Sequence, residues 1–121
     1  MGKILIVDDD AGVADSVALV LREAGHEPRI ASDGRSALAA MTMAPPDACV
    51  LDVWLGEEDG LAVAEAARGR GLPVVVMSGG GPGRSLEQVT ARADALGAVR
   101  VLYKPFDDDE LTDAVAAALG S

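Results

Sequence analysis

The most constraining feature of this chain is a regular alternation of short apolar runs with segments whose apolar residues recur at helical spacing. Apolar runs of this length, bounded by turn residues, are typical of buried strands in a parallel sheet. Parallel strands that alternate with helices require right-handed crossovers, which place helices on both faces of the sheet. We therefore expect a doubly wound α/β fold of three layers. The expected strands are Ile4–Val7, Arg29–Ala31, Ala48–Val53, Pro73–Met77 and Val99–Tyr103.

A helical pattern follows each expected strand. The first pattern stops at Gly25, a residue that readily takes the left-handed conformation found after helices. The second ends before Pro45, because the residue preceding a proline is disfavoured in a helix. A polar loop at 55–59 is expected to lead into the third helix, and the fourth is expected at about Ser85–Leu96. A last helix follows, so five strand–helix units are predicted.

Polar side chains stand at the carboxyl ends of several expected strands. Asp8 and Asp9 follow the first strand, Asp52 follows the apolar part of the third, and Lys104 follows the fifth. Because ligands of open parallel sheets bind outside the carboxyl ends of the strands, we expect these side chains to meet. Clustered carboxylates repel one another and invite a divalent cation, while a nearby lysine suits an anionic group. The combination indicates phosphate chemistry on an aspartate.

Each of these side chains can be given a role in such chemistry. Mg²⁺ prefers octahedral oxygen coordination, which Asp9 and Asp52 could provide with help from Asp8. Lys104 would pair with one phosphoryl oxygen, and the hydroxyl of Ser78, after the fourth strand, could donate to another. The sequence thus predicts a magnesium-assisted phosphoryl site.

Turn formation and helix capping are the competing interpretation for polar residues after strands. Asp10 fits that interpretation well, and a serine before a glycine-rich loop, such as Ser78, is also ordinary turn chemistry. Acids after two strands, a hydroxyl after a third and a lysine after a fourth form a constellation that chance rarely assembles. We therefore favour a functional role for Asp8, Asp9, Asp52 and Lys104.

Composition excludes several classes of function. A chain of 121 residues forms one domain with a single core. Its 20 acidic residues against 10 basic ones produce a negative field that repels nucleic acid and anionic membranes. The single cysteine, Cys49, lies in an apolar run, so we expect a buried thiol and a reducing, cytoplasmic compartment. Residues 1–7 are neither a signal peptide nor a membrane span.

Taken together and in order, the motifs resemble the receiver domain of two-component response regulators. The resemblance covers nearly the whole chain and implies a flavodoxin-like sheet of order 2-1-3-4-5, with residues 1–121 as one stand-alone receiver domain. The matching motifs are Ile4–Asp10, Leu51–Val53 with Asp59-Gly60 after it, Val74–Gly79, and Lys104-Pro105-Phe106.

The resemblance assigns the acidic residues specific roles. It implies that Asp52 is the phosphoacceptor and that Asp8 and Asp9 hold Mg²⁺ together with Asp52. It also implies that the backbone carbonyl of Trp54 is a further metal ligand.

The resemblance likewise implies a switch around the phosphate. Ser78, Gly79 and Lys104 would bind the phosphoryl group, and the peptide before Pro105 would be cis. The aromatic residue that the family usually carries three residues before this lysine is replaced by Val101, which puts the family's aromatic coupling in doubt.

We do not assign the nearby Tyr103 to the missing aromatic role. Two further departures from the family pattern concern neighbouring residues. The loop at 79–84 is longer than is usual for the family, and we expect phosphate to order this loop and the following helix instead. Gly56 replaces a proline that is often found after the acceptor strand.

The resemblance implies protein partners on both sides of the reaction. A histidine kinase or histidine phosphotransfer protein would donate the phosphoryl group. The face of the fourth helix, fifth strand and fifth helix would bind a downstream target, and a weak homodimer is compatible with the family. The protein would catalyse only its own phosphorylation and dephosphorylation. An excised receiver domain of a larger regulator or hybrid kinase is an alternative with the same sequence features.

Other classes fit the sequence less well. An aspartyl-phosphate phosphatase or phosphotransferase generally needs a second acid two residues after the nucleophile, where Trp54 stands after Asp52. A flavin-binding protein of this fold would place glycines and hydroxyls, not acids, after the first strand. A degenerate receiver that serves only as a scaffold would not need the intact acids and lysine.

Overall fold

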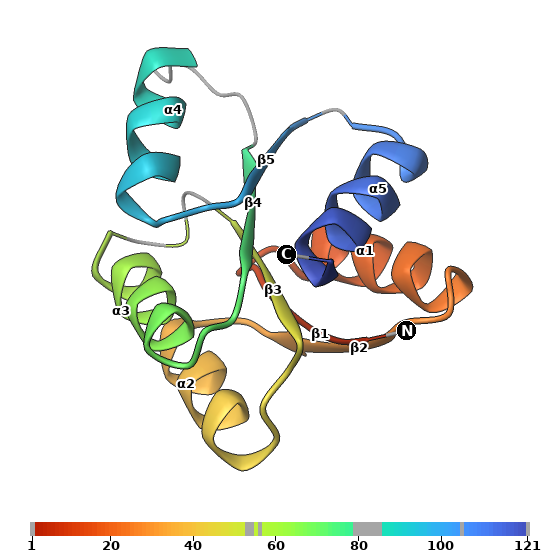
Figure 1. Ribbon diagram of the computed structural model, residues 1–121, viewed down its shortest axis with the longest axis horizontal. Coiled ribbons are helices and arrows are strands. Elements are labelled where there is room, and N and C mark those ends of the chain that lie inside the picture. Colours follow the sequence, from red (N-terminus) through yellow and green to blue (C-terminus); the bar gives the residue numbers. More distant parts are fainter. Residues whose placement is uncertain (1, 53–54, 56, 79–85, 105, 121) are drawn as a thin grey trace.

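The computed structural model describes residues 2–52, 55, 57–78, 86–104 and 106–120, which form parallel strands alternating with helices (Figure 1). In chain order the elements are β1 (Lys3–Val7), α1 (Ala11–Glu23), β2 (Glu27–Ala31), α2 (Gly34–Met43), β3 (Ala48–Asp52), α3 (Glu57–Gly69), β4 (Val74–Ser78), α4 (Leu86–Ala95), β5 (Arg100–Tyr103) and α5 (Asp108–Leu119). No helix in these ranges combines the length and the apolar character needed to cross a membrane.

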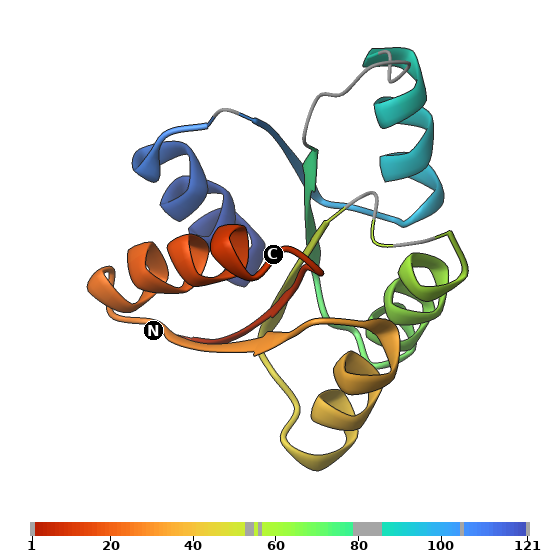
Figure 2. The ribbon, with the colours of Figure 1, turned by 180° about the vertical axis from the view of Figure 1, so that it is seen from behind.

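The strands form one parallel sheet in the order β2-β1-β3-β4-β5. Helices α1 and α5 cover one face of the sheet, and α2, α3 and α4 cover the other, as the two opposite views show (Figures 1 and 2). The predicted doubly wound, flavodoxin-like fold and its strand order are confirmed.

The core consists of two apolar layers, one on each face of the sheet. Side chains alternate between the faces along every strand, so Ile4 and Ile6 of β1 pack under α1 and α5, while Leu5 and Val7 pack under α2 and α3. The three central strands are buried along nearly their whole length. This burial explains why their sequences are continuous apolar runs, and it fixes the strand ends firmly.

Two boundaries differ from the sequence prediction by more than one residue, for identifiable reasons. Strand β2 begins at Glu27 rather than Arg29, because it is an edge strand whose polar, largely exposed residues do not form an apolar run. Helix α3 begins at Glu57, inside the predicted loop, because acidic residues are favourable in the first turn of a helix.

Aspartates cap three of the helices, and one of them bears on the site. The side chain of Asp10 accepts hydrogen bonds from the backbone N–H groups of Gly12 and Val13, at 3.0 and 3.2 Å, and so caps α1. Asp33 and Asp107 cap α2 and α5 in the same way. The capping interpretation of Asp10 is confirmed.

Candidate functional site

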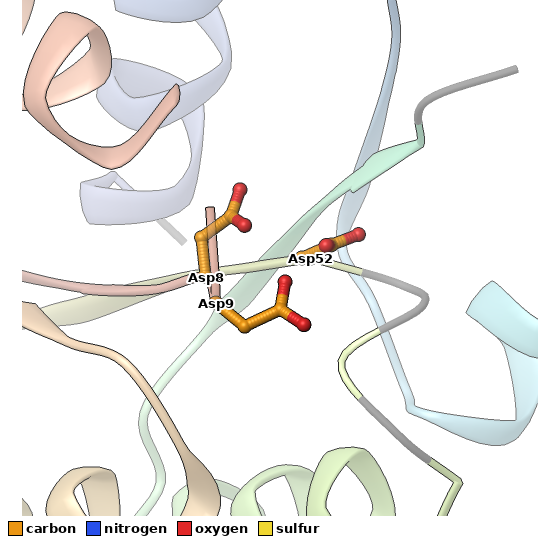
Figure 3. Close-up of side chains that lie close together, drawn as sticks. All are labelled: Asp8, Asp9 and Asp52. Carbon is orange, nitrogen blue, oxygen red and sulfur yellow. The ribbon is translucent and has the colours of Figure 1, made fainter. Parts of the chain in front are cut away.

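Three carboxylates meet where β1 and β3 end. The two strands are neighbours in the sheet, with Val7 paired to Leu51, so the residues that follow them emerge side by side. One carboxylate oxygen each from Asp8, Asp9 and Asp52 lies within 4.8 Å of the others (Figure 3). The sequence prediction that these acids converge is therefore correct.

The three acids differ in exposure. Asp8 is buried, with 1% of its surface exposed, whereas Asp9 is exposed and Asp52 is intermediate. Oδ1 of Asp8 accepts a hydrogen bond from the N–H of Asp10 at 2.9 Å. Its other oxygen, Oδ2, accepts no hydrogen bond from any residue that the structure describes. A buried carboxylate oxygen without a donor is costly, and a cation would relieve the cost.

The electrostatics of Asp8 point the same way. Burial raises the pKa of the Asp8 carboxyl above its ordinary value, against the stabilising N–H of Asp10. The negative charge of Asp52, and to a smaller degree that of Asp9, raises this pKa further, and Lys104 offsets part of the rise. The net rise indicates that the protein surroundings do not fully compensate the buried Asp8 carboxylate.

Lys104 reaches this cluster from the end of β5. Its Nζ lies 3.9 Å from Oδ2 of Asp8, and the lysine side chain is 25% exposed. The backbone N–H of Lys104 donates a 2.8 Å hydrogen bond to the carbonyl of Ser78, which ties β5 to the end of β4. Ser78 itself is buried. The structure thus brings together the acids and the lysine, with Ser78 at the adjoining strand end.

The strand register determines the orientation of Tyr103. Ser78 pairs with Tyr103 and Val76 with Val101 across β4 and β5, so all four residues belong to one face of the sheet. Val101 is partly buried against the core layer on this face, whereas Tyr103 is 43% exposed. Tyr103 therefore lies beside Ser78, and Val101 occupies the position two residues earlier on the same face of the strand.

Several predicted site residues lie outside the described residues. These are Trp54, Gly79 and Pro105, together with the loop at 79–84. Their predicted roles as a metal ligand, a phosphate-binding residue, a cis turn and a phosphate-ordered loop stay predictions.

The donor set fits Mg²⁺. Magnesium is bound by oxygen ligands, commonly one or two carboxylates plus water and substrate phosphate oxygens. The cluster offers carboxylates from Asp8, Asp9 and Asp52, and it includes the buried oxygen of Asp8 that accepts no hydrogen bond within the described chain. Asp9 is exposed and Asp52 is partly exposed, which leaves room for water and a phosphoryl group on the open side.

A groove adjoins the cluster between α1 and α5. It has a volume of about 550 Å³, and its walls are mainly apolar. Val13 and Val20 of α1 face Phe106 and Leu111 across it, and Lys104 stands at its end nearest the acids.

This fold and site define a class of protein. Residues 4–116 match the family model of the response regulator receiver domain, and the chain therefore belongs to that family. Receiver domains are signalling modules of two-component systems, not conventional enzymes that turn over a metabolite. The resemblance found in the sequence is confirmed.

Particular relatives support the same assignment. The chain is 39% identical over 119 residues to the response regulator MprA of Mycolicibacterium vanbaalenii, covering 97% of this chain and 50% of MprA. It is 33% identical over 112 residues to an NtrX-like response regulator of Rickettsia bellii, covering 89% of this chain and 23% of the relative. The chain thus spans half or less of the length of these relatives.

Solved structures agree with the fold. A response regulator from Chloroflexus aurantiacus superposes with a TM-score of 0.87 at 34% identity, covering 99% of this chain and 98% of that one. NtrX from Brucella abortus, solved in complex with ATP, gives a TM-score of 0.86 at 38% identity, covering 98% of this chain and 27% of NtrX.

Proposed function

We propose that this chain is a phosphoacceptor switch in which Asp52 takes a phosphoryl group from a histidine kinase or a histidine phosphotransfer protein. The observation that carries the proposal is the convergence of Asp8, Asp9 and Asp52 within 4.8 Å, with Lys104 beside Asp8. We take residues 1–121 as a single receiver domain, because both core layers pack on one sheet.

The environments of the three acids favour Asp52 as the nucleophile. Asp8 is buried, and its oxygens face the Asp10 N–H and the Lys104 ammonium, so a donor cannot reach them easily. Asp9 stands exposed at the rim of the cluster. Asp52 ends the central strand β3 at intermediate exposure, so an oxygen of its carboxylate is both fixed and accessible. A weak nucleophile of this kind depends on positioning and charge neutralisation.

In the transfer, the only covalent bond that the protein forms is the one between Asp52 and the phosphorus. An Asp52 oxygen attacks the phosphorus of the donor phosphohistidine, the P–N bond breaks, and its electron pair leaves with the imidazole. When bound by Asp8, Asp9 and Asp52, Mg²⁺ would neutralise charge on the phosphoryl oxygens. Lys104 turns from Asp8 to a phosphoryl oxygen, and the Ser78 hydroxyl donates to another. The Trp54 carbonyl as a further ligand belongs to the same proposal.

We place the phosphoryl donor on the groove between α1 and α5. Lys104 lines this groove and also pairs with Asp8, so a protein seated there would have its reactive group next to the acids. The apolar walls formed by Val20 and Phe106 suit an amphipathic helix of the donor. Small donors such as acetyl phosphate would not need this surface.

We place the downstream partner on the face of α4, β5 and α5. Tyr103 is exposed on this face and stands next to Lys104, so it is close to the phosphoryl site whose state the partner would recognise.

We also propose a cytoplasmic location. The single cysteine, Cys49, supports it, because this residue is a free, buried thiol, as is usual in a reducing compartment.

The direct experiment is intact-mass measurement after incubation with acetyl phosphate. We expect one phosphoryl adduct on the wild type in the presence of Mg²⁺, little adduct when the metal is chelated, and none on Asp52→Asn. An adduct of equal yield on Asp52→Asn would disprove the acceptor assignment. The thermal unfolding curve of Asp52→Asn serves as the control for folding.

A further inference from the structure

Two arginine–glycine contacts connect α3 and α4 in opposite directions. Arg68, in the last turn of α3, lays its guanidinium against Gly97, just after α4. Arg92, on α4, reaches back to Gly60 near the start of α3. Each helix therefore contributes one arginine, which contacts a glycine in the other helix or just after it. Figure 1 shows the two helices on the same face of the sheet.

The absence of a side chain at both glycines makes these contacts possible. A Cβ atom at Gly97 would overlap the Arg68 guanidinium, with Cζ and Nε only 3.2 Å away. A Cβ atom at Gly60 would lie 3.1 Å from Nη2 of Arg92. Two other glycines nearby, Gly69 and Gly71, have no atom within 4 Å of such a Cβ. Of these four glycines, only the two that face an arginine are closely packed.

The buried apolar side chains of this region that the structure describes lie at the C-terminal end of α4. Ala93 and Leu96 are buried there, whereas Glu87 near its start is exposed. A pocket of ≈ 270 Å³ lies between the C-terminal part of α3 and the segment that follows α4, with Arg68, Leu72 and Leu96 in its lining. The two segments are therefore not closely packed at this end, where Arg68 reaches Gly97.

The Arg68 contact is a packing contact. Among the described residues, no carboxylate lies within ion-pair distance of its guanidinium. A planar guanidinium packs flat on a backbone surface in a way that an ammonium cannot, so lysine would not replace it. The contact therefore depends on shape as well as on charge.

We propose that these two contacts form a latch that sets the position of α4, with Arg68 and Arg92 as positioning residues. Gly60 lies in the part of α3 that follows Asp52 most closely in the chain, so a change at Asp52 that moves this turn changes the Arg92 contact. This second step rests on the proposed phosphoacceptor function. The first step, the latch itself, does not depend on it.

Matched glycine variants test the latch. Gly97 and Gly71 have the same left-handed backbone, with φ of +71° and +70°, so alanine strains both equally, but only Gly97 meets an arginine. We expect Gly97→Ala to accelerate amide exchange in α4 by about tenfold relative to α1, and Gly71→Ala to change this ratio by less than about twofold. Equal effects of the two variants would overturn the latch.

Removing the arginines provides a second test that does not depend on strained glycines. Arg68→Ala and Arg92→Ala should each accelerate α4 exchange relative to α1, while Glu87→Ala, at an exposed position of α4, should not. In the Arg68→Ala background, Gly97→Ala should add little beyond the effect of Gly71→Ala in that background. Unchanged α4 exchange in both arginine variants would also overturn the latch.

Acetyl phosphate with Mg²⁺ tests the coupling to Asp52. We expect phosphorylation to change α4 exchange in the wild type, and Arg92→Ala to lose that change while its intact mass still shows the adduct. An adduct without any change in wild-type α4 exchange would refute the coupling and leave the phosphoacceptor function standing. Absence of the adduct from the wild type would refute that function and the coupling, whereas the latch is decided by the phosphate-free variants.

Discussion

The ammonium group of Lys104 lies 3.9 Å from Oδ2 of Asp8, the buried carboxylate oxygen that accepts no hydrogen bond from the described residues. The lysine at the end of β5 is thereby linked to the acid after β1, across the two strands between them. Phosphorylation of Asp52 would offer this lysine a second anionic partner. A residue shared between two partners can change its contact when the charge of the site changes.

Lys104→Ala should separate metal binding from signal transmission. We expect Mg²⁺ affinity to be retained or to rise, because the competing cation beside Asp8 is removed. The change that phosphorylation produces in α4 and β5 should be weakened, because the phosphoryl oxygens lose this charge. Titration with Mg²⁺ and amide exchange with acetyl phosphate measure the two effects. Loss of Mg²⁺ affinity would show that the lysine serves the metal instead.

Asp8→Asn should stabilise the metal-free protein at neutral pH. The substitution removes a buried charge, and the asparagine oxygen can still accept the N–H of Asp10. We expect the free energy of unfolding at pH 7.5 to rise by about 1 kcal/mol, with a loss of Mg²⁺ affinity. Urea denaturation with and without chelator measures both. A large loss of stability would mean that the charged form of Asp8 is needed for folding.

The stability difference between Asp8→Asn and the wild type should depend on pH. Because the pKa of Asp8 is raised in the folded state, the folded protein binds this proton more tightly than the unfolded chain does. The contribution of Asp8 to the unfolding free energy therefore falls as pH rises through the window between its ordinary and its raised pKa. The advantage of Asp8→Asn should be full above this window and disappear below it. An equal advantage at all pH values would contradict the assignment.

Asp9→Ala and Asp10→Ala form a matched pair of neighbouring acids. We expect Asp9→Ala to lower Mg²⁺ affinity by about tenfold, since it removes one of the three clustered carboxylates. Asp10→Ala should leave the affinity nearly unchanged and lower stability by about 1 kcal/mol, since it removes the cap of α1. Titration calorimetry and urea denaturation separate these effects. A similar loss of affinity in both variants would point to general charge rather than ligation.

Val20→Asp and Leu19→Asp test the donor surface. Val20 lines the groove between α1 and α5, whereas Leu19 is 53% exposed and is absent from its lining. We expect Val20→Asp to slow phosphoryl transfer from a histidine phosphotransfer protein by about tenfold or more, and Leu19→Asp to have little effect. Acetyl phosphate should label both variants at the wild-type rate, which controls for folding. Equal slowing by the two variants would place the donor elsewhere.

The sequence predicted the meeting of Asp8, Asp9, Asp52 and Lys104 because a parallel sheet brings the carboxyl ends of its strands to one edge. It also predicted the cap at Asp10 and the helix stop at Gly25, because both depend on local backbone chemistry. These features follow from a residue and its immediate neighbours, or from the sheet as a whole.

Features that depend on strand register and helix packing could not be predicted in this way. The burial of Asp8 and exposure of Asp9 follow from where β1 leaves the sheet. The place of Tyr103 beside Ser78 requires the pairing of β4 with β5. The contacts of Arg68 with Gly97 and of Arg92 with Gly60 require the two helices to be placed relative to each other.

The identity of the acceptor can be tested most directly by locating the phosphoryl group after acetyl phosphate treatment. Borohydride reduces an aspartyl phosphate to homoserine, and fragment mass spectrometry then finds the modified position. We predict homoserine at position 52 in the wild type, with Asp8 and Asp9 unmodified. Homoserine at either of those acids, or a stable phosphoryl group on another side chain, would contradict the assignment of Asp52.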